Sequence, residues 1–222
     1  MCISSKASIF TFIFSIISSI ILIFYGNTKF KDENLISGLL MIYVAFMQIF
    51  DYFIWIDLNN EKGYNKIASQ LAAFFNYTQP LVIYIFSYIV YSLKYSYSIS
   101  AQKLIVNFKK NIYIGLINLL YFIYFLINYY KFLNSKEVIT YLKDGHLKWN
   151  WSKYFNIWFY LLLLLINLWF VFTNIKYLLI IIFFIFGTLI FSYIKFNNNI
   201  GELWCYIFAY FPLLLCYLTY LI

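Results

Sequence analysis

The chain has 222 residues, of which 64% are hydrophobic, and its mean hydropathy is +0.80. A soluble domain is about 45–50% apolar, so this composition excludes a soluble globular protein and indicates one integral membrane domain over residues 1–222. The net charge of +8 comes from lysines that lie mostly in short loops, where we expect them to contact lipid headgroups and not nucleic acid.

Seven apolar stretches are long enough for a helix to cross a bilayer, which takes about 20 residues. The fifth and sixth form one run that is too long for a single crossing, so we place a tight turn at 174–176. The sequence therefore predicts an all-α bundle of seven transmembrane helices. The predicted spans are 7–25, 35–56, 67–93, 112–130, 154–173, 177–194 and 200–222.

An odd number of spans places the two termini on opposite sides of the membrane. Nine lysines fall on the N-terminal side and seven on the other, but five of the nine lie in the segment 131–153, which we expect to be folded. Without that segment the positive-inside rule predicts an N-terminus that is outside or lumenal and a cytoplasmic C-terminus. Asn150-Trp151-Ser152 is a glycosylation pattern on the predicted outer side.

The segment 137–151, between the fourth and fifth spans, has its own structural signal. Two strand-prone runs flank Asp144-Gly145, a pair that favours the tight turn of a β-hairpin. An isolated hairpin is only marginally stable, so we expect this one to rest on the helix ends, with Trp149 and Trp151 as anchors. The alternative is a solvated loop in which Asp-Gly occurs by chance.

Scarce residue types gather on the N-terminal side of the predicted bundle. Asp51 lies inside the second span and shares a helix face with Trp55, and a carboxylate at that depth usually points toward a partner within the bundle. In the third span, Pro80 leaves a backbone carbonyl without its helical donor. The predicted ligand-binding residues are Asp51, Trp55, Asn76, Gln79, His146, Glu202 and Trp204.

Each of these residues also has a purely structural interpretation. Asp51 could join two helices, Asn76 and Gln79 could form interhelical hydrogen bonds, and Glu202 could stabilise a helix N-terminus. The tryptophans could belong to an interfacial belt, and His146 could simply be solvated at the turn. Two polar stripes are predicted to be helix–helix contacts: Ser8, Thr11, Ser15 and Ser18 in the first span, and Asn156, Asn167 and Asn174 along the fifth.

Short motifs at 47–55, 145–151 and 201–205, with Gln79-Pro80 between them, resemble uncharacterised multi-pass membrane proteins encoded by large DNA viruses. Asp51 departs from that pattern, in which the acid is more often Glu. The resemblance implies a seven-span fold and carries no known activity.

We expect a non-enzymatic membrane protein with an outward-facing pocket or partner surface. Its partners would be the bilayer and a small amphipathic ligand, a lipid or another membrane protein. The alternative is a small transporter or channel that uses Asp51, Asn76 and Gln79 as a polar step, and a third possibility is an enzyme acting on lipid, with Asp51 or Glu202 as general acid or base. A single histidine is too few for a metallo-hydrolase, so no metal or cofactor is expected.

Overall fold

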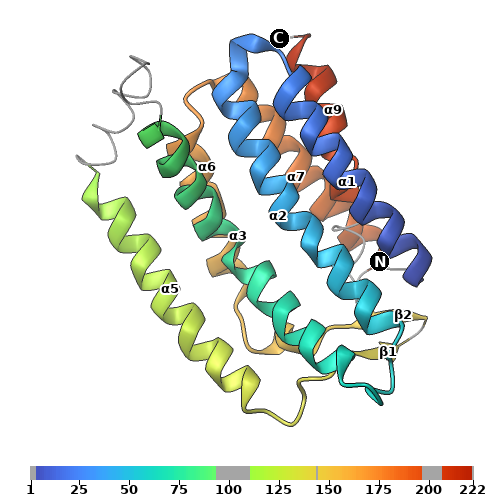
Figure 1. Cartoon of the computed structure of the whole chain (residues 1–222). Coiled ribbons are helices and arrows are strands. Elements are labelled where there is room, and N and C mark those ends of the chain that lie inside the picture. Colours follow the sequence, from blue (N-terminus) through green and yellow to red (C-terminus); the bar gives the residue numbers. More distant parts are fainter. Residues whose placement is uncertain (1–3, 94–110, 144, 197–206, 222) are drawn as a thin grey trace.

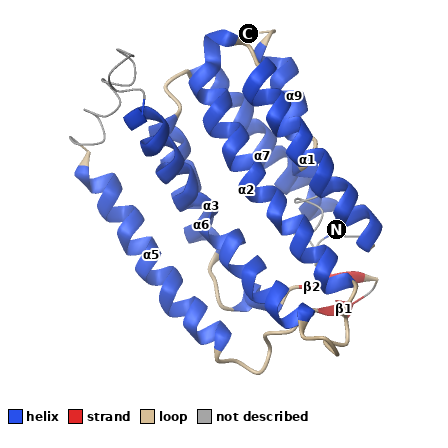
Figure 2. Ribbon diagram, in the orientation of Figure 1, coloured by secondary structure: helices blue, strands red, loops and turns tan. Residues whose placement is uncertain are grey.

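A computed structural model of the chain describes residues 4–93, 111–143, 145–196 and 207–221. Within these residues the chain forms seven α-helices and a two-stranded antiparallel sheet (Figures 1 and 2). The helices are α1 (Ser5–Tyr25), α2 (Lys31–Trp55), α3 (Tyr64–Leu93), α5 (Ile112–Leu133), α6 (Ile157–Val171), α7 (Ile175–Phe196) and α9 (Phe211–Thr219). The strands are β1 (Tyr141–Lys143) and β2 (His146–Lys148), and short 3-10 helices cover Thr28–Phe30 and Asn150–Lys153.

Five of these helices, namely α1, α2, α3, α5 and α7, are long and apolar enough to cross a membrane. The predicted spans therefore correspond to helices, and the chain is a multi-pass helical membrane protein. Of the predicted seventh span, residues 200–206 and 222 lie outside the described residues, and α9 is the helical part that can be described. Asp32 and Glu33 occupy the first turn of α2, where the helix dipole favours acids, so this helix begins before its apolar stretch.

Helices α1, α2 and α3 pack side by side, α9 packs on α1, and α6 packs on α3. Figure 1 shows the N- and C-termini at opposite ends of the bundle and α5 at its edge. The small polar stripe of α1 is buried. From this stripe, Thr11 donates to Gln48 of α2 at 2.9 Å and Ser18 to the carbonyl of Ala209 at 3.3 Å. The prediction that this stripe is a helix–helix contact is confirmed.

The predicted hairpin is present between α5 and α6. Tyr141 pairs with Lys148 and Lys143 with His146. Gly145 has φ +76°, in the left-handed region that favours glycine. Trp149 and Trp151 are buried, their rings stacked at a centroid distance of 4.9 Å.

The chain that leads from the hairpin to α6 runs into the bundle and does not stay at its end. Phe155 stacks on Tyr77 of α3 with ring centroids 3.9 Å apart. Tyr77 lies 13 residues from the start of α3, which corresponds to about 20 Å along the helix. We call residues 134–156, which include the hairpin, the cap.

This path of the cap corrects the predicted fifth span. The sequence predicts a helix over 154–173, but α6 covers Ile157–Val171 and has 15 residues, about 22 Å in length against a hydrocarbon core of about 30 Å. The apolar rings of Tyr154 and Phe155 pack within the protein in the cap. Asn156 then begins the helix by accepting a hydrogen bond from the backbone of Trp158.

Candidate functional site

The cap is fastened to the first turns of α3 by a compact set of buried hydrogen bonds. The side chain of Asn65 accepts from the backbone N–H of Thr140 at 3.1 Å and donates to its carbonyl at 2.8 Å. The hydroxyl groups of Ser69 and Thr140 are 2.7 Å apart. All three residues are fully buried, so these bonds fix the hairpin to the bundle where water does not compete.

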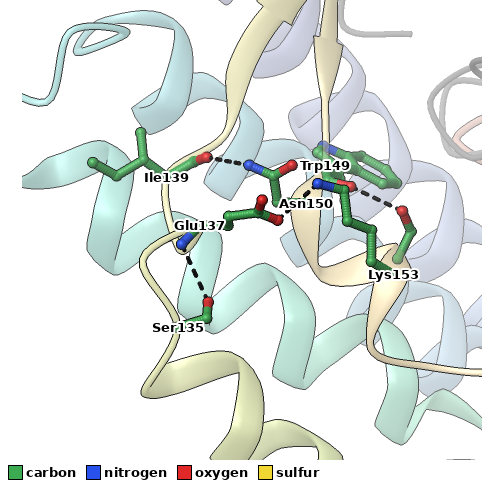
Figure 3. A network of polar contacts seen from close by, with 7 residues as sticks. Ser135, Glu137, Ile139, Trp149, Asn150 and Lys153 are labelled. Carbon is green, nitrogen blue, oxygen red and sulfur yellow. Dashed lines mark hydrogen bonds and ion pairs between the residues drawn. The ribbon is translucent and has the colours of Figure 1, made fainter.

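The cap is also closed on itself, as Figure 3 shows. The buried Asn150 donates its side-chain N–H to the carbonyl of Ile139 at 2.9 Å. On the exposed surface Lys153 and Glu137 form an ion pair at 2.7 Å, and the hydrogen bond to Glu137 raises the pKa of Lys153. The side-chain nitrogen of Asn150, which would carry a glycan, is therefore hydrogen-bonded within the cap. The glycosylation pattern at 150–152 thus does not support the predicted orientation in the membrane.

The turn between α2 and α3 is organised by Asp57. Its carboxylate accepts hydrogen bonds from the backbone N–H groups of Lys62, Tyr64 and Asn65, at 3.2, 2.8 and 3.4 Å. Burial alone would raise the pKa of Asp57, but these hydrogen bonds stabilise the charged form more and hold the pKa below its usual value. Asp57 thus holds in place the helix start that receives the cap.

The predicted site residues on the hairpin side lie in α2 and β2. Asp51 is fully buried within α2. Trp55, the last residue of α2, is half-buried, and its indole N–H has no acceptor among the described residues. His146 begins β2 and is half-buried. Glu202 and Trp204 lie outside the described residues, so their place relative to Asp51 stays a prediction.

The two predicted residues of α3, Asn76 and Gln79, differ in burial and in contacts. Asn76 is half-buried, whereas Gln79 is buried and accepts a hydrogen bond from Tyr160 of α6 at 2.6 Å. Gln79 lines a small cavity beside the segment 37–44 of α2. Asp51 lies seven residues beyond that segment, about 10 Å along the helix, and neither it nor Asn76 lines the cavity. The three residues do not share one described cavity.

A larger hollow than the Gln79 cavity is an apolar crevice between α5 and α6, with a volume of about 230 Å³. Its walls are eight apolar and aromatic side chains: Ile117, Leu120, Tyr121 and Tyr124 from α5, and Phe159, Leu162, Leu163 and Ile166 from α6. Several of them, including Leu120, Phe159 and Leu162, are exposed. The crevice therefore opens on the surface of the bundle.

Hydrogen bonds between α5 and α6 bracket this crevice at both ends. At one end Asn118 and Asn167 donate to each other, at 3.0 and 2.8 Å. At the other end the hydroxyl of Tyr124 accepts from the backbone N–H of Asn156 at 2.8 Å. We call these two connections the pins, because each joins α5 to α6 or to its first residue at one end of the crevice.

The pins also leave the crevice walls apolar. Tyr121 turns its hydroxyl away to donate to the carbonyl of Tyr77 at 2.8 Å, and the Tyr124 hydroxyl is used by Asn156. Part of this arrangement was predictable from the sequence, because Asn167 was predicted to be a helix contact. The position of Asn167 between α5 and α6 agrees with that prediction. Nothing in the sequence indicated the contact of Asn118, which is one of several asparagines in apolar stretches. Among the described residues no three His, Cys, Asp or Glu side chains form a metal-binding group.

Comparison of the chain with models of protein families, with curated proteins and with solved structures finds no match. The resemblance to viral multi-pass proteins therefore stays a prediction.

Proposed function

We propose that this protein is a non-enzymatic, lipid-binding membrane protein whose crevice between α5 and α6 takes one acyl chain of a bilayer lipid. The observation that carries the proposal is an apolar crevice of about 230 Å³ that opens sideways and is held at both ends by hydrogen bonds. This volume is many times the roughly 10–15 Å³ that one water-sized group needs, so the crevice has room for several methylene groups.

Three occupants of such a crevice can be compared: vacuum, water and hydrocarbon. An empty crevice leaves its walls without dispersion partners. Water finds few hydrogen-bonding groups, since the Tyr121 hydroxyl donates to Tyr77 and the Tyr124 hydroxyl accepts from Asn156, and water entering an apolar site is unfavourable. The acyl chains that surround the protein have the matching chemistry and reach the opening directly.

A photoreactive phosphatidylcholine with a diazirine in the middle of one chain tests this proposal in lipid nanodiscs. We expect labelling to concentrate at 117–124 and 159–166, and Leu120→Trp to reduce it several-fold by filling the opening. Leu119→Trp is the matched control, because Leu119 is exposed on the same helix outside the crevice. Even labelling of all lipid-facing helices, equal in both variants, would refute the proposal.

We also propose a second role, recognition of a ligand or membrane partner at an outward-facing rim formed by Asp51 and the other predicted ligand-binding residues. A fully buried acid inside a spanning helix favours it. The remaining rim residues of the proposal are Trp55, Asn76, Gln79, His146, Glu202 and Trp204, and the hairpin side would face outside or the lumen. The transporter alternative has weaker support, because the Gln79 cavity is lined mainly by apolar side chains.

Substitution of Asp51 distinguishes recognition from a structural role. Asp51→Asn removes the charge and keeps the shape. A recognition role predicts that it abolishes capture of a partner in cross-linking experiments on intact membranes while the yield of folded protein is unchanged. A lower yield of folded Asp51→Asn protein, with capture unchanged per folded molecule, would leave only the structural role.

A further inference from the structure

A second hollow, separate from the proposed lipid crevice, lies at the centre of the bundle between α2, α3, α6 and α7. Its volume is about 30 Å³, and a cavity needs only about 10–15 Å³ to hold one water molecule. Most of its lining is apolar, but Ser37 and Gln79 also line it. We call it the central cavity.

Gln79 has an unused polar atom at this cavity. One amide atom of its side chain pairs with the hydroxyl of Tyr160 at 2.6 Å, and the other has no hydrogen-bond partner among the described residues. This holds whichever way the amide is turned, because Tyr160 reaches only one of the two atoms. Gln79 is 6% exposed, and leaving such a buried group unsatisfied costs about 1–3 kcal/mol.

Ser37 offers a second group at the cavity. The hydroxyl of Tyr177 in α7 lies 3.1 Å from the Ser37 hydroxyl, but its single hydrogen is shared with the side-chain oxygen of Asn34, so the Ser37 oxygen can accept a hydrogen bond from water. Tyr177 also lies 3.1 Å from Asn34, whose side chain donates to the carbonyl of Asn27 at 3.1 Å. Ser37 thus ends a buried polar chain that runs toward the end of the bundle where α2 begins.

We propose that the central cavity is a binding site for a water molecule that bridges Gln79 and Ser37. Buried water typically makes two to four hydrogen bonds to polar groups that lack other partners, and these two side chains supply the minimum. The bridge would join the Tyr160–Gln79 pair to the chain of Ser37, Tyr177 and Asn34. One water would thereby connect four helices at the centre of the bundle.

Filling the cavity distinguishes a wet site from a dry one by the sign of the effect. Val44 lines the cavity, and Val44→Ile adds one methyl group there. If the cavity holds water, the added methyl group displaces it and leaves the Gln79 amide without a hydrogen-bond partner, so we expect a lower midpoint of unfolding. If the cavity is dry, the methyl group fills it and the midpoint would rise. Val82→Ile, on a half-buried residue of α3 outside the cavity, is the matched control and should leave the midpoint nearly unchanged.

Nuclear magnetic resonance gives an independent readout on the unmodified protein. With ¹⁵N-labelled glutamine, we expect nuclear Overhauser cross-peaks between the Gln79 side-chain amide protons and water, and their loss in Val44→Ile. Absence of these cross-peaks in the unmodified protein, or a raised midpoint in Val44→Ile, would overturn the proposal. Neither result bears on labelling of the lipid crevice, so the two proposals fail separately.

Discussion

Asn118 of α5 and Asn167 of α6 donate a side-chain hydrogen bond to each other, at 3.0 and 2.8 Å, and Asn167 also donates to the carbonyl of Pro80 in α3 at 2.7 Å. Three helices therefore meet at one pair of amides. Apolar helices have no hydrophobic reason to associate in lipid, and polar contacts of this kind hold them together. Together with Tyr124 and Asn156 at the other end, this pair sets where α5 touches α6 and where it does not.

Removing one member of the pair should weaken the bundle. Asn118→Leu leaves Asn167 with an unused acceptor, and we expect a loss of about 1–2 kcal/mol in the free energy of unfolding. A double-mutant cycle with Asn167→Leu, measured by unfolding in mixed detergent micelles, should give a coupling of about 0.6–1.7 kcal/mol. Asn128→Leu is the control, because Asn128 donates only to Tyr124 of its own helix; a coupling near zero would contradict the assigned contact.

The cap should detach when its attachment to α3 is removed. Asn65→Ala removes the hydrogen bond to the Thr140 carbonyl, and it leaves the Thr140 N–H with only the Ser69 hydroxyl at 3.2 Å. Leaving the buried carbonyl without a donor costs about 1–3 kcal/mol. We expect faster tryptic cleavage at Lys136, Lys143 and Lys148 while the spanning helices stay intact. Asn134→Ala serves as control, since Asn134 is exposed and bonds only within α5. Equal cleavage rates in the two variants would show that the cap is held elsewhere.

Acid should loosen the turn that Asp57 organises. Its pKa is lower in the folded chain than the ordinary value of 3.8. The stabilisation is therefore complete above the unfolded-state pKa and is lost as pH falls through the lower folded-state pKa. We expect the thermal midpoint to fall below about pH 4, with a smaller fall in Asp57→Asn. A pH profile that is identical in the two proteins would mean that Asp57 contributes nothing to acid sensitivity.

The spanning helices were predictable because each requires a long apolar run. The hairpin was predictable because Asp144-Gly145 is a strong local turn signal. The residue at which α6 starts was not predictable from the sequence. A hydropathy pattern records that Tyr154 and Phe155 are apolar but not that they pack against Tyr77 within the protein. The pattern therefore extended the fifth span into the cap.

The candidate site stays a prediction, because the sequence does not show how the helices pack on one another. Helix-face spacing places residues on one side of one helix, but the relation between helices depends on packing. Gln79 lines the central cavity and Asp51 does not. The crevice depends on Asn118 and Tyr124, which nothing in the sequence separates from many similar residues. Long-range pairs such as Asn118 with Asn167 can be identified only once the fold is known.

Asn150 should remain unmodified in the folded protein even if the cap faces a glycosylating compartment. Its side-chain nitrogen is buried and bonded to Ile139, so a glycan there would break the cap. Expression in mammalian cells followed by glycosidase treatment checks this, and we expect no shift in electrophoretic mobility. Ser152→Ala, which removes the acceptor pattern, should migrate identically. A glycosidase-sensitive band that is folded and lost in Ser152→Ala would show that the cap does not close as described.

A crystal structure grown from a lipidic mesophase, at a resolution that shows acyl chains, tests the lipid proposal most directly. The account predicts continuous density for one chain between the pins, in contact with Leu120 and Leu162, and the Asn118–Asn167 pair in place. If α5 and α6 are instead closed against each other, with Leu120 packed directly on Leu162 and no room for a chain, the proposed function is wrong.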